Sequence, residues 1–281
     1  MNTIYLSLLQ TSQNRHMELI RFVKSLNAQY EIDLKEIQLI FIDQGSNKYI
    51  FEELDKKINF IYIKNEPCSL SHARNVGLKY AKGKYIGFPD DDCWYEPDTL
   101  SKVMNLLKNR YDGVVCYGSD ENNNPTNSFA LNSQIISKYN HCGAISYTIF
   151  LKYVKDLYFD EKIGVGSSLK FLSGEETDYL IRFMEQVSSN VYYTRNICVH
   201  HPLAKSDYFQ NETNKMYYYA RGYGYLLRKH SYPWILKIKA FIRPLGGMIV
   251  YSICLKLVRA NRSWNIFKGR LEGYIESKRF F

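Results

Sequence analysis

Short apolar runs alternate with amphipathic segments along the first 120 residues of the chain. Residues 4–10 (IYLSLLQ) and 37–42 (IQLIFI) are largely apolar, a pattern typical of strands that are buried on both faces. Residues 15–26 instead carry apolar side chains at helical spacing. The alternation continues through strand-like segments at 58–64, 84–89 and 112–118 and helix-like segments at 51–57, 70–83 and 96–109.

Strands that alternate with helices at this spacing predict an α/β fold, with a mostly parallel sheet and helices on both of its faces. In such sheets ligands bind at the carboxyl ends of the strands. Polar residues follow three predicted strands at that end: Thr11–Ser12, Asp43 and Asp90–Asp92. The sequence therefore predicts a ligand site where these strand ends meet.

Two domains are expected from the change of character near residue 205. Residues 1–205 would form the α/β domain, in which the stretch around 120–170 is less regular. Residues 206–281 mix aromatic, basic and apolar residues. We expect a helical C-terminal extension there.

The C-terminal extension carries the positive excess of the chain. Residues 221–281 contain 13 Lys or Arg and two acidic residues, against a net charge of +9 for the whole chain. The longest charge-free run, residues 244–255, is shorter than the roughly 20 residues that cross a bilayer. This composition predicts an amphipathic helix on an anionic membrane surface. A helix packed on the main domain is the alternative.

Other compartments and partners are disfavoured by the composition. The six cysteines include no CxxC pair, which predicts free thiols in a reducing cytosol. The N-terminus lacks the pattern of a signal peptide. The basic tail has no RNP-like or helix-turn-helix-like pattern, so we expect no nucleic-acid partner.

Asp90, Asp91 and Asp92 stand side by side, with no basic residue within five positions. In an extended segment residues i and i+2 point to the same side, and two converging carboxylates are costly unless a cation compensates them. A hard divalent ion such as Mn²⁺ or Mg²⁺, which also takes phosphate oxygens, would compensate them. The alternative is an acidic turn that caps the following helix.

Several motifs together resemble those of family 2 glycosyltransferases with the GT-A fold, a Rossmann-like α/β fold found in enzymes of bacterial surface-polysaccharide assembly (O-antigen, capsule, exopolysaccharide). The likeness covers roughly residues 4–205 and is weaker in YARGYGYLLRKH (219–230). It is carried by FIDQGS (41–46), LSHARNVGLKYAKGKYIGFPDDDCWYEPD (70–98), FDEKIGVGSS (159–168), GEETDYLIR (174–182) and VHHP (199–202).

The resemblance implies three contacts with a nucleotide. Asp43 would bind the base, Ser12 would touch the nucleotide, and Arg74 would lie near the diphosphate. From the residues alone, Asp43 could instead cap a turn and Arg74 could form a structural salt bridge. The first strand also lacks the proline that is usual before this turn, and Gln44 stands where many relatives have a second Asp.

The resemblance also implies a metal site. Asp90 and Asp92 match the D-x-D motif, in which Asp92 would hold the ion and Asp90 the ribose or a metal-bound water. Asp91 is a further candidate for nucleotide binding, although alternation turns it away from its neighbours. His201 would add a metal or diphosphate ligand; a surface histidine is the alternative.

GEETD matches the second acidic motif of the family, which supplies the catalytic base. By position Glu176 is the base, while Glu175 and Asp178 are close enough to compete. The motif has Glu-Glu where relatives have Glu-Asp. The alternative is a helix N-terminus with acids that the helix dipole favours.

The expected activity is an inverting, metal-dependent transfer of a sugar from a nucleotide-sugar, by default a UDP-sugar, to a hydroxyl of a lipid-linked or saccharide acceptor. The expected location is the cytoplasmic face of the plasma membrane, as a peripheral protein on the inner leaflet. A non-catalytic nucleotide-sugar-binding protein and a metal-dependent nucleotidyltransferase or phosphatase are the alternatives.

Overall fold

The computed structural model describes residues 3–203 and 210–281. The chain forms two compact units. The sheet unit comprises residues 3–68, 72–159 and 179–203, and the helical unit comprises residues 69–71, 160–178 and 210–281. The predicted domain boundary near residue 205 stays a prediction, since the helical unit also takes in a segment that precedes it.

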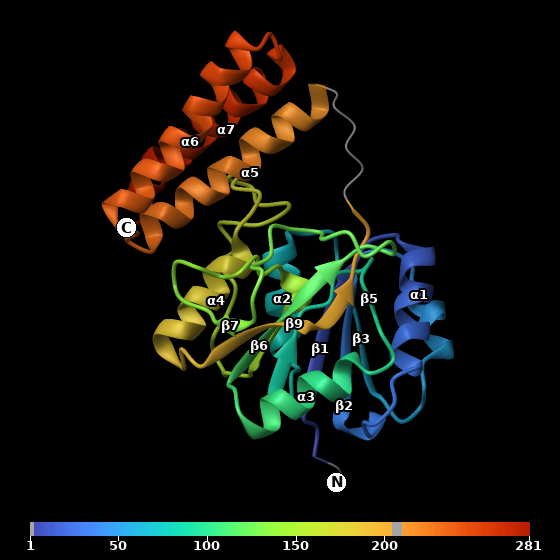
Figure 1. Ribbon diagram of the computed structural model, residues 1–281. Coiled ribbons are helices and arrows are strands. Elements are labelled where there is room, and N and C mark those ends of the chain that lie inside the picture. Colours follow the sequence, from blue (N-terminus) through green and yellow to red (C-terminus); the bar gives the residue numbers. More distant parts are fainter. Residues whose placement is uncertain (1–2, 204–209) are drawn as a thin grey trace. The chain divides into compact units, whose positions relative to one another are not determined.

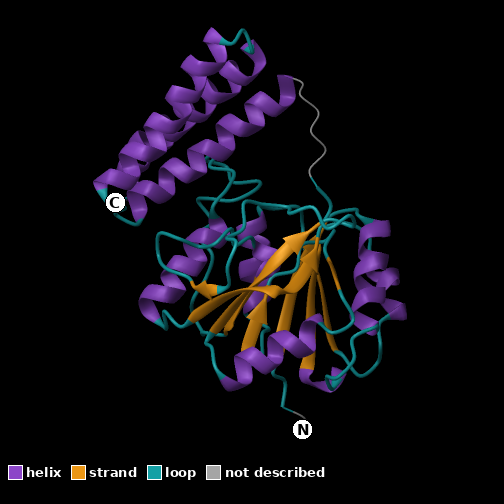
Figure 2. Ribbon diagram, viewed as in Figure 1, coloured by secondary structure: helices purple, strands orange, loops and turns teal. Residues whose placement is uncertain are grey.

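A nine-stranded sheet forms the centre of the sheet unit (Figures 1 and 2). Its parallel part has the order β3-β2-β1-β4, with β1 (Leu6–Ser12), β2 (Ile37–Asp43), β3 (Asn59–Lys64) and β4 (Tyr85–Gly87). The other strands are β5 (Trp94–Tyr95), β6 (Gly113–Ser119), β7 (Gln134–Ile135), β8 (Ile149–Lys152) and β9 (Val191–His200). β8 runs antiparallel between β4 and β6, whereas β6 and β9 are parallel.

Both faces of the central strands are buried, which explains their continuous apolar runs. On one face Leu39 and Phe41 of β2 pack in a core with α1 (His16–Asn27) and α3 (Thr99–Asn109). On the other face Ile40 and Ile42 pack in a smaller cluster with α2 (Leu70–Leu78). Side chains that alternate along β2 thus serve two layers of helices.

The predicted α/β fold with a mostly parallel sheet is confirmed, and so is the helical C-terminal region. The helix expected at 51–57 is wrong, because the chain forms a 3₁₀-helix at Lys48–Glu53. The helix predicted at 70–83 ends at Leu78. Strand β8, four residues long, lies in the stretch that looked irregular.

Three long helices make up most of the helical unit: α5 (Gln210–Lys229), α6 (Trp234–Ile253) and α7 (Leu257–Glu276). Glycines let α5 and α7 approach closely. A Cβ on Gly224 would lie 2.2 Å from the backbone oxygen of Arg270, and a Cβ on Gly273 would lie 2.2 Å from that of Arg221. Helix packing therefore explains Gly224 of the GYG, whereas a Cβ on Gly222 would lie 2.2 Å from the backbone oxygen of Ser173. Among the described residues, no helix has the length and apolarity needed to cross a bilayer.

Candidate active site at the strand ends

The predicted ligand site lies in the sheet unit, where β1 ends at Ser12, β2 ends at Asp43 and β4 leads into Asp90–Asp92. The acidic segment does not continue as a strand. The Cys93 amide donates to the Asp90 carbonyl over 3.3 Å, which closes a turn. The extended geometry assumed for residues 90–92 is therefore wrong, and the three carboxylates have different surroundings.

Each carboxylate of the triplet meets a cation from a distant part of the chain. Arg74 of α2 donates to Asp90 over 2.9 Å. Arg15, just before α1, contacts Asp92 at 2.7 Å and Asp91 at 3.5 Å. His201 Nε2 lies 2.8 Å from the other oxygen of Asp92. These cations offset the repulsion among the three adjacent carboxylates.

Burial and pairing push the pKa values of the triplet apart. Burial raises the pKa of Asp91 to about 6, although the Ser12 hydrogen bond and the Arg15 charge oppose it. Burial also raises the pKa of Asp92, but hydrogen bonding and charge from His201, with Arg15, outweigh it and lower the pKa overall. Burial lowers the pKa of His201, yet Asp92 raises it more. Asp92 and His201 thus favour an ion pair.

The structure places Asp43 inward, with no exposed surface. Its carboxylate accepts hydrogen bonds from the amides of Gly45 and Asn47, the side chain of Asn47 and the hydroxyl of Tyr62. Burial raises the pKa of Asp43, but these hydrogen bonds outweigh it and lower the pKa. This geometry is the turn cap that the sequence left open, and contact with a nucleotide base stays a prediction.

Arg74 and Ser12 also act on the triplet from buried positions. Arg74 is 1% exposed, and its guanidinium lies 5.3 Å from the ring centre of Phe159. The Ser12 hydroxyl donates to Asp91 over 2.7 Å. Both side chains hold acids of the triplet in place. Contact with a diphosphate or a nucleotide stays a prediction for each.

Sequence reasoning missed three neighbours of the triplet. They are Arg15, Ser146, which donates to Asp90 over 2.9 Å, and Tyr147, whose ring stacks on His201 at 4.6 Å. Ser146 and Tyr147 lie in the stretch that looked irregular. The sequence indicates Arg15 only weakly as a site residue, because it is a basic residue shortly after the first strand.

The donors fit a divalent ion only as part of a larger complex. Within residues 3–203 and 210–281, no group of three or more His, Cys, Asp and Glu side chains is arranged to hold a metal alone. Asp92 and Asp90 supply carboxylate oxygens, and His201 would supply a nitrogen donor only after it leaves Asp92 and loses its proton. Mg²⁺ and Mn²⁺ sites often use one or two carboxylates with phosphate oxygens and water. The residues therefore fit an ion that arrives with a diphosphate.

The acids of GEETD begin α4 (Glu175–Gln186), and residues 175–178 belong to the helical unit. Asp178 is fully buried and contacts Lys229 Nζ at 2.7 Å and His230 Nε2 at 2.9 Å. Glu175 is 5% exposed, whereas Glu176 is half-buried. Glu176 is therefore the most accessible of the three predicted bases.

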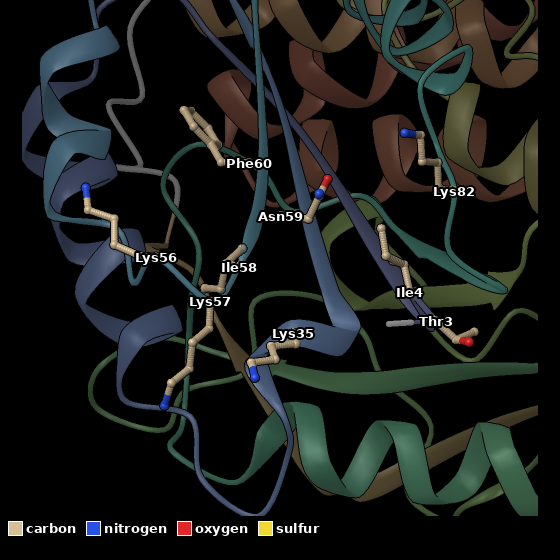
Figure 3. A pocket seen from close by; sticks show the side chains of 9 residues that line it. All are labelled: Thr3, Ile4, Lys35, Lys56, Lys57, Ile58, Asn59, Phe60 and Lys82. Atoms are coloured by element: carbon tan, nitrogen blue, oxygen red, sulfur yellow. The ribbon is translucent and has the colours of Figure 1, made fainter. Parts of the chain in front are cut away.

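A pocket of about 790 Å³ lies elsewhere in the sheet unit (Figure 3). It is lined by residues that precede or begin β1, β2 and β3, including Ile4, Lys35 and Asn59. Its lysine side chains point in different directions rather than toward one point. The pocket therefore lies at the amino ends of these strands, away from the acidic triplet.

Comparison with known proteins decides the family. The sequence profile described as glycosyl transferase family 2 matches residues 9–169, more than half of the chain. The chain belongs to glycosyltransferase family 2. The match spans Ser12, Asp43, Arg74 and the acidic triplet but stops before GEETD.

Curated relatives of this family 2 chain are similar over part of their length. The minor teichoic acid biosynthesis protein GgaB of Bacillus subtilis is 30% identical over 159 residues, which cover 50% of this chain and 18% of GgaB. The putative glycosyltransferase EpsH of B. subtilis is 32% identical over 120 residues, which cover 41% of this chain and 34% of EpsH. The chain thus spans less than two thirds of the length of these relatives.

Solved structures show the same fold at low identity. S. aureus TarS 1–349 in complex with UDP has a TM-score of 0.56 at 14% identity, covering 96% of this chain and 91% of that chain. The mannosyltransferase PcManGT from Pyrobaculum calidifontis, in complex with GDP-Man and Mn²⁺, has a TM-score of 0.62 at 12% identity, covering 98% and 87%. The predicted GT-A-like fold is confirmed.

Replacing Asp91 by Asn should stabilise the protein in a pH-dependent way. The folded state raises the pKa of Asp91 to about 6. The raised pKa therefore costs no stability below the unfolded pKa of Asp, and the unfolding free energy falls as the pH rises from there through about 6. We expect D91N to exceed the wild type in unfolding free energy by up to about 3 kcal/mol near pH 8, with no gain near pH 4. Denaturant titrations at both pH values measure this. The exposed control E52Q should show no such pH dependence.

Replacing Lys229 by Met should destabilise the helical unit. Lys229 bridges the buried Asp178 and Asp160, each at 2.7 Å, and its loss leaves two carboxylates short of a cation. We expect a loss of about 3 kcal/mol or more in unfolding free energy, measured by urea denaturation. The control K268M removes an exposed lysine whose contact with Glu272 is 3.9 Å long. Equal stabilities for the two variants would contradict the assignment.

Proposed function

We propose that the chain is an inverting, metal-dependent glycosyltransferase. It would move a sugar from a nucleotide-sugar, by preference a UDP-sugar, to a hydroxyl of a lipid-linked or saccharide acceptor in surface-polysaccharide assembly. The observation that carries the proposal is the acidic triplet, held by Arg15, Arg74 and His201 at the carboxyl ends of the strands in a family 2 fold. Solved structures of the same fold, in complex with UDP-GlcNAc and with GDP-Man and Mn²⁺, support a nucleotide-sugar donor.

Asp90, Asp92 and His201 would hold Mn²⁺ or Mg²⁺ in the proposed site. The ion, when bound, would stabilise the negative charge that grows on the departing diphosphate. Arg74 fixes Asp90 from a buried position, while the side chain of Asp90 keeps 26% of its surface exposed. Arg15 is half-exposed, so its guanidinium has room to turn toward a diphosphate. Ser12 and Asp91 would lie on the nucleotide side, and Asp43, which is buried, would act there through the turn that it caps.

Glu176 is proposed as the general base. It would remove the proton of the acceptor hydroxyl as that oxygen attacks the anomeric carbon, and a single displacement inverts the configuration. Asp178 is poorly suited to be the general base, because it is fully buried and its carboxylate is paired with Lys229 and His230. Glu175 is nearly as buried. We assign both residues to holding the first turn of α4.

The C-terminal extension is proposed to hold the enzyme on the inner leaflet, beside a lipid-linked acceptor. Its basic residues would be attracted to an anionic leaflet by about 1 kcal/mol each when close to the surface. The helices α6 and α7 expose many apolar side chains in addition. A peripheral, cytoplasmic location follows from the proposal, as does the division into a catalytic domain (1–205) and a membrane-binding extension (206–281).

Sugar nucleotides should stabilise the protein in a metal-dependent way. A ligand at 100 times its Kd adds about 2.7 kcal/mol to the unfolding free energy, which raises the melting temperature. We expect a larger shift with a UDP-sugar and Mn²⁺ than with either alone. D92A should abolish the metal-dependent part, whereas E121A, a change at an exposed acid, should retain it. A full metal-dependent shift in D92A would refute the proposed site.

Replacing Glu176 by Gln should separate binding from chemistry. Loss of a general base lowers kcat by about two to four orders of magnitude, whereas the donor-induced thermal shift should stay at the wild-type level. The value of kcat is measured for sugar transfer to a saccharide acceptor, with release of the nucleotide diphosphate as the readout. E175Q is the matched control and should lose less. Wild-type turnover in E176Q would exclude Glu176 as the base.

A further inference from the structure

Helix α6 carries an isoleucine stripe that the described part of the helical unit leaves largely exposed. The stripe consists of residues that are 44 to 77% exposed: Ile235, Ile238, Ile242, Ile249 and Ile253. Their spacing of three, four, seven and four positions places them on one face of the helix. Ala240 and Pro244, on the opposite face, are buried. The helix therefore turns its most apolar side chains outward.

The turn between α6 and α7 continues this apolar surface. Leu255, Leu257 and Val258 are 83, 67 and 60% exposed. Leu255 also has a positive φ of 55°, a conformation in which Gly or Asn would cost less. Folding stability alone does not explain an exposed leucine there, whereas contact with an apolar phase outside the protein does.

The charges around the stripe identify its partner. Residues 231–271 contain eight Lys or Arg and no acid. Lys239 and Arg243 lie one turn apart beside the stripe, and both are exposed. A second copy of this face would bring like charges together, which disfavours self-association. An anionic lipid surface satisfies both features, because it offers headgroups to the cations and acyl chains to the isoleucines.

We propose that α6 lies flat in the interface of an anionic membrane, with its isoleucine stripe and the α6–α7 turn in contact with the acyl chains. The stripe runs about 27 Å along the helix, at 1.5 Å for each residue. Flat binding needs no membrane-spanning segment. This inference rests on the membrane part of the proposed function and assigns it to a defined surface.

Vesicle binding of the full-length chain tests the inference. The wild type should co-sediment with vesicles of phosphatidylcholine and phosphatidylglycerol, and much less with phosphatidylcholine alone. The double variant I242D/I249D should lower the partition coefficient by roughly tenfold or more, because two apolar contacts become charged. The control L131D/I135D makes the same change in net charge at exposed apolar residues of the sheet unit and should bind like the wild type.

The outcomes separate the surface from the function. Equal binding of I242D/I249D and the wild type would overturn the stripe as the membrane contact while keeping the membrane proposal. Failure of the wild type to bind either vesicle would overturn both, without affecting the metal-dependent donor shift. A wild-type dimer in sedimentation equilibrium that I242D/I249D dissociates would make the stripe a contact between copies and also overturn the inference. Retention of the donor shift in both variants shows that they fold.

Discussion

Charge compensation of three adjacent carboxylates is the constraint on which the ligand end of the sheet unit depends. Asp90, Asp91 and Asp92 follow a buried strand, where their repulsion is poorly screened. Arg15 comes from the start of α1, Arg74 from α2 and His201 from the chain after β9. Satisfying the triplet therefore fixes three segments that are far apart in sequence. The buried position of Arg74 becomes intelligible, since its charge is paired at that end of the sheet.

The helical unit follows the same physical rule and adds a second one. Asp178 and Asp160 are compensated by Lys229, which ties the start of α4 to the end of α5. Gly224 and Gly273 then bring the backbones of α5 and α7 into contact, so the glycine-bearing faces of these two helices pack against each other. The isoleucines of α6 are left outside. The exposed stripe is thus a consequence of which helix faces the unit needs for its own packing.

The layers of the fold were predictable, because strands buried on both faces leave continuous apolar runs and the helices between them leave periodic ones. The short strand β8 was not, since four residues carry little periodicity. At the site, the acids were visible as a local motif. Their partners Arg15 and Ser146 were not, because 77 and 56 residues separate them from Asp92 and Asp90. The turn at Asp90 also defeated the i, i+2 argument, which holds only for extended backbone.

The cations around the triplet differ in exposure, and this difference bears on how a donor would enter. Arg74 is buried in the core and pairs with Asp90 from there. The Arg15 side chain is 51% exposed and holds Asp92 from the solvent side. A divalent ion alone would have to compete with Arg15 for Asp92. A diphosphate that arrives with its own ion would give Arg15 a new anionic partner when Arg15 leaves the Asp92 carboxylate. Under the proposed function, this charge balance would favour binding of the donor and the ion together.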